Sequence, residues 1–337
     1  MTTTADLEEF GGGLESAGGV DKVVAGRSPT RIALQRLRSD KVAMVSAGTV
    51  WLLVLLALLA PVITSAMGVY ATSTHPDAPL PSEVLSYDGF PATGPPYHEW
   101  TWEHPLGLAP RTGVDNFARL LYGLRTSLAV ATAATVLSTL IGVSLGLVAG
   151  FARGWLDRVI SFTIDLFLSF PFILGALALA PIIVSRFSTD LDVLARAQVL
   201  ALVAVLVVFG WMGLARLIRG QVLSLREREF IQAAQVMGVP TRHILFRELL
   251  PNLVAPIVVA ISLSLPAYVA AEAGLSYLGI GLTGVPSLGQ TINDAVNSFD
   301  KYPLYLWAPV VTVMVLVLAL NLLGDSIRDA FDPRTRR

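Results

Sequence analysis

The chain is 337 residues long and only 15% charged, whereas a soluble domain has roughly 25% charged residues. Its 54% hydrophobic content and mean hydropathy of +0.65 exclude a disordered chain and favour a multi-spanning membrane protein over a soluble enzyme. The formal net charge of -1, with no block of like charge, argues against nucleic acid as a partner. Without cysteine there are no disulfides, thiolate metal sites or catalytic thiols.

Residues 1–41 are expected to form a cytoplasmic tail. They open on an acidic, Gly-rich stretch, whereas a secretory signal would have a basic start and a short apolar core. The tail ends in RSPTRIALQRLRSDK, where Ile32, Leu34 and Leu37 alternate with basic residues. This pattern predicts a short basic amphipathic helix at a membrane surface, with a frayed solvated tail as the alternative.

Six windows have the length of a membrane-spanning helix, which needs about 20 apolar residues because its backbone polar groups must be satisfied within the segment. They are roughly Val42–Thr64, Thr126–Gly150, Val159–Ser185, Ala197–Ala215, Leu249–Ala271 and Tyr302–Gly324. We therefore expect an all-α polytopic membrane protein. Its expected parts are the tail 1–41, the first span with a long extracytoplasmic loop (42–125), the transmembrane core (126–324) and a cytoplasmic C-terminal tail (325–337).

The direction of the spans follows from the basic residues, since Lys and Arg in short loops are retained in the cytoplasm. The tail, loop 151–158, loop 216–248 and the segment after Gly324 hold 18 of the 24 basic residues. Both termini are therefore predicted to lie in the cytoplasm. The Pro-rich and aromatic segment 67–125 then faces outside, as a plain surface loop or a contact for an external partner.

The cytoplasmic loop 216–252 is predicted to form two short helices. Phe230, Ala233, Ala234 and Met237 recur at helical spacing, and Gly238 stands where a left-handed residue would end the helix. Pro240 suits the first turn of a second helix, whose apolar stripe is Ile244, Leu245, Leu249 and Leu250. The two alanines would let another protein approach closely. The alternative is a loop that packs only on its own spans.

The sequence FIQAAQVMGVPTRHILFRELLPN resembles the EAA loop of ABC-importer permeases, which docks into a groove of the cytoplasmic ATPase. The family's usual Glu before the two alanines is Gln232 here, and its usual His before Leu-Pro is Glu248. The resemblance implies a coupling role for seven residues of this loop: Phe230, Gln232, Ala233, Ala234, Met237, Gly238 and Arg242.

Other segments resemble the C-type permease subunit of the dipeptide, oligopeptide and nickel importers. They are HPLGLAPRTGVDNFARLLYGLRTSLAV, AGFARGWLDRVISFTIDLFLSFPFIL, EAGLSYLGIGLTGVPSLGQTI and NLLGDSIRDAFDPR, although the acidic-Gly-Arg-Asp core that usually follows HPLG is altered.

This resemblance covers roughly residues 30–335 and implies the type I ABC-importer permease fold in a bacterial inner (plasma) membrane. It also implies partners: a homologous permease in a heterodimer, two ATP-binding subunits or domains that hold ATP and Mg, and an extracytoplasmic substrate-binding protein. No cofactor is expected in this chain. The implied function is import of di- or oligopeptides, with nickel chelates or haem as alternatives within the family.

Three polar residues inside the spans are candidates for the translocation path: Asp165, Glu272 and Asn321. A charge at bilayer depth is costly unless it is paired or wetted. Asp165 could line the path, but Arg158 is seven residues away, which favours a structural ion pair inside the bundle. Pro171, Pro266 and Pro309 can kink spans.

The sequence does not support a catalytic function. The four histidines show no HExxH spacing, and none of the three lysines follows a Gly as a Walker A loop requires, so the chain is not the ATPase. A self-contained secondary transporter, with Asp165 or Glu272 binding a driving ion, is the main rival, although no internal repeat is visible. A membrane scaffold without a transport role is a third reading.

Overall fold

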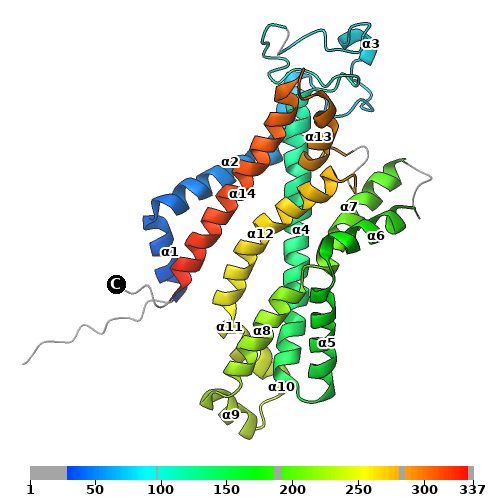
Figure 1. The fold of residues 1–337 in the computed structure, drawn as a ribbon. Coiled ribbons are helices and arrows are strands. Elements are labelled where there is room, and N and C mark those ends of the chain that lie inside the picture. The colour runs from blue at the N-terminus through cyan, green and yellow to red at the C-terminus, as the bar shows by residue number, and fades with distance from the viewer. Residues whose placement is uncertain (1–28, 96–97, 186–190, 281–284, 333–337) are drawn as a thin grey trace, which may run out of the picture.

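The structure, a computed structural model, describes residues 29–95, 98–185, 191–280 and 285–332. These residues form long helices and one long, mostly non-helical segment, in agreement with the expected all-helical fold (Figure 1). The predicted tail before residue 29 lies outside the described residues. The helices are α1 (Pro29–Ser39), α2 (Lys41–Met67), α3 (Pro81–Val84), α4 (Asn116–Phe151), α5 (Trp155–Ser169), α6 (Phe172–Ser185), α7 (Leu191–Val208), α8 (Met212–Leu225), α9 (Glu229–Val236), α10 (Thr241–His243), a π-helix (Ile244–Leu249), α11 (Leu250–Asn252), α12 (Val254–Tyr277), α13 (Leu288–Ala295), a 3-10 turn (Val296–Ser298) and α14 (Pro303–Phe331).

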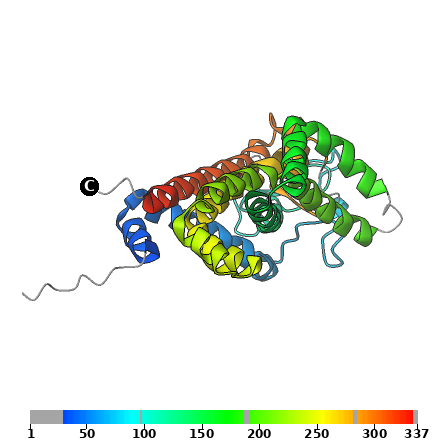
Figure 2. The same cartoon turned by 90° about the horizontal axis from the view of Figure 1, so that it is seen from below.

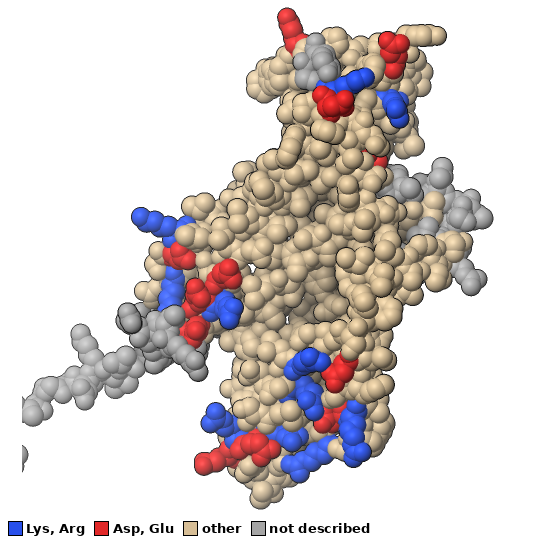
Figure 3. All heavy atoms as spheres, viewed as in Figure 1, with Lys and Arg blue, Asp and Glu red and all other residues tan. Residues whose placement is uncertain are grey.

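Five helical units are long and apolar enough to cross a membrane, and the bent pair of α5 and α6 makes up to six. The five are α2, α4, the unit Val193–Leu225 that joins α7 to α8, α12 and α14. In Figure 3 the visible Lys, Arg, Asp and Glu side chains gather at the ends of the molecule and around α1, and leave an uncharged band between them. Each of the six predicted windows is thus occupied by helix.

The helix ends differ from the predicted ones. α4 begins at Asn116, before the expected Thr126, and α8 continues to Leu225, inside the expected loop 216–252. α14 likewise runs through most of the segment expected as a C-terminal tail, 325–337. Hydropathy windows stop at the first charged residue, but a helix continues wherever its charged side chains reach water or find partners on a neighbouring helix.

The third predicted span, Val159–Ser185, is bent by 89° between α5 and α6, at Pro171, where the sequence allows a kink. Phe170 has φ -89° and ψ 130°, which is extended backbone. Proline disfavours the helical region for the residue before it, so Pro171 accounts for the break at Phe170. Pro266 and Pro309, in contrast, lie inside α12 and α14, each of which continues past its proline.

α4 is the central helix and packs closely against α8. Gly142, Gly146 and Gly150 recur every fourth residue along the contact. A Cβ built on Gly146 would lie 2.7 Å from the carbonyl oxygen of Ala215, and one on Gly150 would lie 2.6 Å from Cβ of Val222. In membranes, small residues let two helix backbones approach closely, so this glycine repeat fixes α8 on α4.

The remaining spans pack around α4. α12 and α2 contact it directly, and α14 packs on both of them. Seen from below, α1 and α14 lie at one side of the molecule, and α6 and α7 lie at the other (Figure 2). The largest apolar cluster joins these helices through residues such as Ala57, Leu124, Leu206, Val269 and Leu316.

The segment predicted as a short basic amphipathic helix forms the helix α1. Asp40 ends it and caps α2, since its Oδ1 accepts a hydrogen bond from the Val42 N–H at 2.9 Å. The Ser326 hydroxyl of α14 donates to the other oxygen of Asp40 at 2.9 Å. These two hydrogen bonds, that from Ser326 first, lower the pKa of Asp40 below its usual value. α1 is therefore tied to the end of α14, beside the first turn of α2.

The long segment between α2 and α4 is anchored at the start of α4. Asp115 caps this helix by accepting from the Ala118 N–H at 2.7 Å, and its second oxygen lies 2.8 Å from Nδ1 of His104. Arg119 on the next turn pairs with Asp294 of α13 at 2.5 Å. The segment and α13 thus lie at the same end of the bundle, opposite the end that carries α9 (Figure 1).

Candidate functional site

The candidate coupling segment, residues 229–252 (α9 to α11), protrudes at one end of the bundle and is called the knob. α9 lies at the tip of the molecule, next to the end of α8 and below α11 and α12 (Figure 1). Arg226, at the end of α8, donates from Nη1 to the carbonyl oxygen of Gly150 on α4 at 3.2 Å. The knob is therefore attached to the α4–α8 pair through a side chain as well as through the chain itself.

α9 ends as predicted. Gly238 has φ +73°, and its N–H donates to the Gln235 carbonyl at 3.1 Å. The next N–H, of Val239, donates to the Ala234 carbonyl at 3.0 Å. These bonds satisfy carbonyl groups that a helix end would otherwise leave unpaired, and the left-handed residue turns the chain toward Pro240.

The two faces of α9 differ in exposure. Ile231 and Ala234 are buried in an apolar cluster with residues of α8 and the π-helix, among them Ile218 and Val222. The expectation that Ala234 presents a low profile to another protein is therefore wrong, because its side chain points into this chain's own core. Ala233 and Gln232 are on the exposed side.

A ridge of apolar side chains is exposed on the knob. Phe230 is 44% exposed, Val236 is 89% exposed and Met237 is 74% exposed. Phe246 adds a fourth large apolar side chain at 63% exposure. We call these four residues the α9 ridge. Val236 and Phe246 were missed by the sequence analysis, which looked for the family's motif positions and for helical periodicity.

The second predicted helix of the loop has a different geometry. Pro240 precedes it as the N-cap of α10, and the chain then passes through the π-helix and α11. Of its predicted apolar stripe, Ile244 and Leu249 are buried against α8 and α9. The sequence gives the apolar positions of this segment, but its periodicity cannot separate an α-helix from a short π-helix. Arg242 is exposed on the knob.

Asp165 has a different partner from the one expected. It pairs with Arg216 of α8, not with Arg158 of its own helix. A second pair lies closer to the α9 end, where Arg219 binds both oxygens of Asp157 at 2.7 and 3.1 Å. Sequence separation along one helix favoured Arg158, but the antiparallel packing of α5 on α8 brings the arginines of α8 nearer.

Glu272 and Asn321 lie apart from Asp165 and from each other. Glu272 is fully buried in α12, and the Ser276 hydroxyl donates to its Oε1 at 2.8 Å. Ser127 of α4 and Ser287 at the start of α13 are near the same carboxyl group, whose Oε2 has no hydrogen-bond partner among the described residues. Asn321 is exposed on α14. The three predicted polar residues therefore do not form one site.

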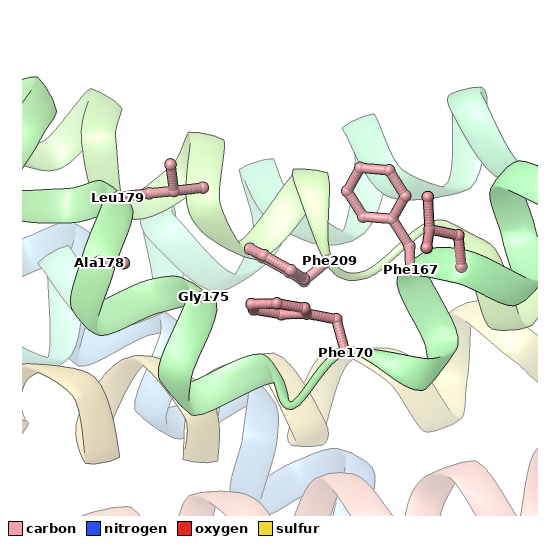
Figure 4. Close-up of a pocket in the computed structure, with 7 residues that line it drawn as sticks. Phe167, Phe170, Gly175, Ala178, Leu179 and Phe209 are labelled. Carbon is pink, nitrogen blue, oxygen red and sulfur yellow. The ribbon is translucent and has the colours of Figure 1, made fainter.

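An apolar pocket of about 360 Å³ lies at the break between α5 and α6. Figure 4 shows the rings of Phe170 and Phe209 stacked one on the other in its lining, with Phe167 beside them. The sequence analysis did not identify this pocket, because its residues come from both sides of the bend. Its lining is Leu166, Phe167, Phe170, Gly175, Ala178, Leu179 and Phe209.

Comparison with known proteins agrees with this architecture. Residues 142–337 match the model of the binding-protein-dependent transport system inner membrane component, and residues 28–77 match the N-terminal TM domain of oligopeptide transport permease C. A chain of the MetNI methionine ABC transporter, solved in inward facing conformations, has the same fold. It superposes with a TM-score of 0.51 and 22% identity, over 64% of this chain and 96% of that chain.

Characterised relatives cover nearly the whole sequence. The dipeptide transport system permease protein DppC of Alkalihalophilus pseudofirmus is 33% identical over 92% of this chain and 91% of its own length. The oligopeptide transport system permease protein OppC of Bacillus subtilis is 30% identical over 90% of both chains. OppC of Mycobacterium tuberculosis is 37% identical over 66% of this chain and 74% of its own. This chain belongs to the family of binding-protein-dependent transport system inner membrane components.

Proposed function

We propose that this chain is the C-type permease subunit of an ATP-driven importer for di- or oligopeptides. The support is the match over nearly the whole chain to dipeptide and oligopeptide transport permeases. Membership of the family makes the chain a multi-pass component of a bacterial inner membrane and not itself an ATPase. ATP and Mg are bound by partner subunits.

The α9 ridge carries the coupling part of the proposal. Four large apolar side chains stand exposed on a knob that also holds Gln232 and Ala233 of the EAA-like sequence. Large apolar side chains exposed among polar residues mark protein contacts. These four side chains lie beyond the end of α8, outside the uncharged band of the spans. We assign the α9 ridge to docking on a cytoplasmic ATPase subunit, and we propose with it that both termini lie in the cytoplasm.

The partners follow from this assignment. A homologous permease completes the path as a heterodimer, two ATP-binding subunits or domains contact the two coupling knobs, and an extracytoplasmic binding protein delivers the peptide. Closure of the ATPase pair on ATP would move α9. Because α9 packs on α8, and α8 is fixed on α4 by the glycine repeat, the motion would reach the spans as a rigid-body shift.

The test is purification of this subunit from its native membrane in mild detergent, followed by identification of the co-purifying chains and an ATPase assay. We expect a second permease and ATPase chains, with ATP hydrolysis stimulated by a peptide-loaded binding protein. Recovery of the chain alone, or stimulation only by nickel chelates or haem, would contradict the proposal.

Gly238 tests the coupling role directly. Replacing it with valine should lower peptide uptake per ATP hydrolysed about fivefold, since a β-branched residue resists φ +73° and would misplace the Met237 side chain. The space around a Cβ at this position is open, so the effect arises from the backbone alone. Coupled uptake is measured in proteoliposomes that contain the whole complex.

The matched control for Gly238 is asparagine, which tolerates left-handed backbone. Gly238→Asn should retain most of the coupled uptake. Equal coupling in the valine variant and the wild type would show that the left-handed turn has no part in coupling.

A further inference from the structure

The Asp165–Arg216 pair is unusually exposed for an ion pair within spans. The side chain of Asp165 is 63% exposed and that of Arg216 is 58% exposed. In the neighbouring pair, Asp157 and Arg219 are 24% and 30% exposed, and the arginine binds both carboxylate oxygens. The more buried pair, Asp157–Arg219, already ties α5 to α8. The more exposed pair, Asp165–Arg216, is called the outer pair, and it presents its charges to whatever covers this face.

The depth of the outer pair follows from the packing of α8 on α4. Gly146 of α4 lies against the Ala215 carbonyl, so Arg216 is level with this part of α4. The uncharged stretch of α4 extends past this level, from 126 to 152. The pair therefore lies about 9 Å inside the α9 end of this uncharged stretch, where exposure to lipid is costly for charged groups and water or polar partners are required.

The surface of α8 beside Arg216 is open. Gly213 and Gly220 flank Arg216 on the exposed side of α8, and a Cβ on either would meet nothing within 4 Å. Ser169 of α5 is exposed one turn beyond Asp165. Phe162 and Leu168, one turn to either side of Asp165, add exposed apolar surface, so the face combines a charged pair with apolar side chains.

The apolar pocket at the α5–α6 break begins on the helix that carries Asp165. Leu166, the residue after Asp165, is part of its lining, and Phe209 lies between Phe167 and Gly175 (Figure 4). The acid of the pair is thus next in sequence to a residue that lines an apolar pocket of about 360 Å³. A pocket of this size is in the range of small-molecule sites.

We propose that the α5–α8 face lines the water-filled path and is a contact site for a zwitterionic peptide. Arg216 binds the peptide carboxylate, Asp165 binds its ammonium group, and the pocket receives an apolar side chain. This inference rests on the proposed function, since it names the residues through which the substrate passes. Charge-assisted hydrogen bonds to both ends would favour a peptide with free termini over one with blocked termini.

This chain contains no cysteine, so a single introduced cysteine reports the accessibility of its own position to a thiol reagent when labelling is read on this chain. In the full complex, Gly213→Cys should react with a charged, membrane-impermeant thiol reagent in the resting state, and more slowly when the ATPases are trapped closed. Leu58→Cys, 67% exposed on α2, is the control for a lipid-facing position and should stay unlabelled. An unlabelled Gly213→Cys in a complex that transports would overturn the assignment.

Substrate contact is read from protection of the same cysteine. Millimolar Ala-Phe should slow labelling of Gly213→Cys about tenfold, as one charge-assisted hydrogen bond supplies, and N-acetyl-Ala-Phe-amide should not. Adding Arg216→Gln should abolish this protection. Equal protection by both peptides, or by neither, overturns the contact site.

Peptide uptake by the wild-type complex is measured in parallel and keeps the two proposals apart. Uptake without protection refutes only this inference, whereas no uptake of any peptide refutes the proposed function on which it rests.

Discussion

Replacing Met237 with aspartate is expected to reduce ATP-driven peptide uptake at least tenfold and to remove the ATPase subunits from the purified complex. Met237 is 74% exposed at the end of α9, so the change should not disturb the fold of this chain. In the assembly it would place a charge in an apolar contact. Truncation of an interface hot spot costs about 2 kcal/mol or more, and an unpaired buried charge adds to that.

The control for Met237→Asp is Tyr87→Asp. Tyr87 is fully exposed in the segment between α2 and α4, at the opposite end of the bundle. This variant should retain its ATPase subunits, as judged by co-purification and by the ATPase activity of the pull-down. Normal ATPase recovery with Met237→Asp would remove the α9 ridge from the coupling interface.

Gly146→Val is expected to destabilise the fold itself, by about 1–3 kcal/mol, as inserting bulk into a packed core does. The first added atom would lie 2.7 Å from the Ala215 carbonyl oxygen and 2.8 Å from Cβ of Ile218. Backbone cannot yield as the end of a flexible side chain can, so α8 must move away from α4. The loss is measured as a lower midpoint of unfolding in a detergent titration.

Gly48→Val on α2 is the matched control for Gly146→Val, because both residues are helical glycines within spans. A Cβ at Gly48 would meet nothing within 4 Å, so its unfolding midpoint should remain near that of the wild type. If the two variants unfold at the same midpoint, close α4–α8 packing does not limit the stability of the bundle.

The coupling segment shows how far local sequence reasoning reaches. The end of α9 at Gly238 was predicted because a left-handed turn followed by proline has a local signature. The inward orientation of Ala234 was not predicted, since it depends on where α8 and the π-helix lie around α9. The α4–α8 contact had a usable sequence signal, the glycines at 142, 146 and 150, but it was not used.

The sequence by itself determined the all-helical membrane fold, the approximate positions of the spans and the family resemblance. These depend on composition, on apolar length and on motifs that are contiguous in the chain. Only the tertiary structure decided that Arg216 and not Arg158 pairs with Asp165, and that Glu272 lies among serines from two other helices. Each of these depends on which helix packs beside which. The hydropathy of a helix does not specify its neighbours, because helices of similar hydropathy can pack in many arrangements.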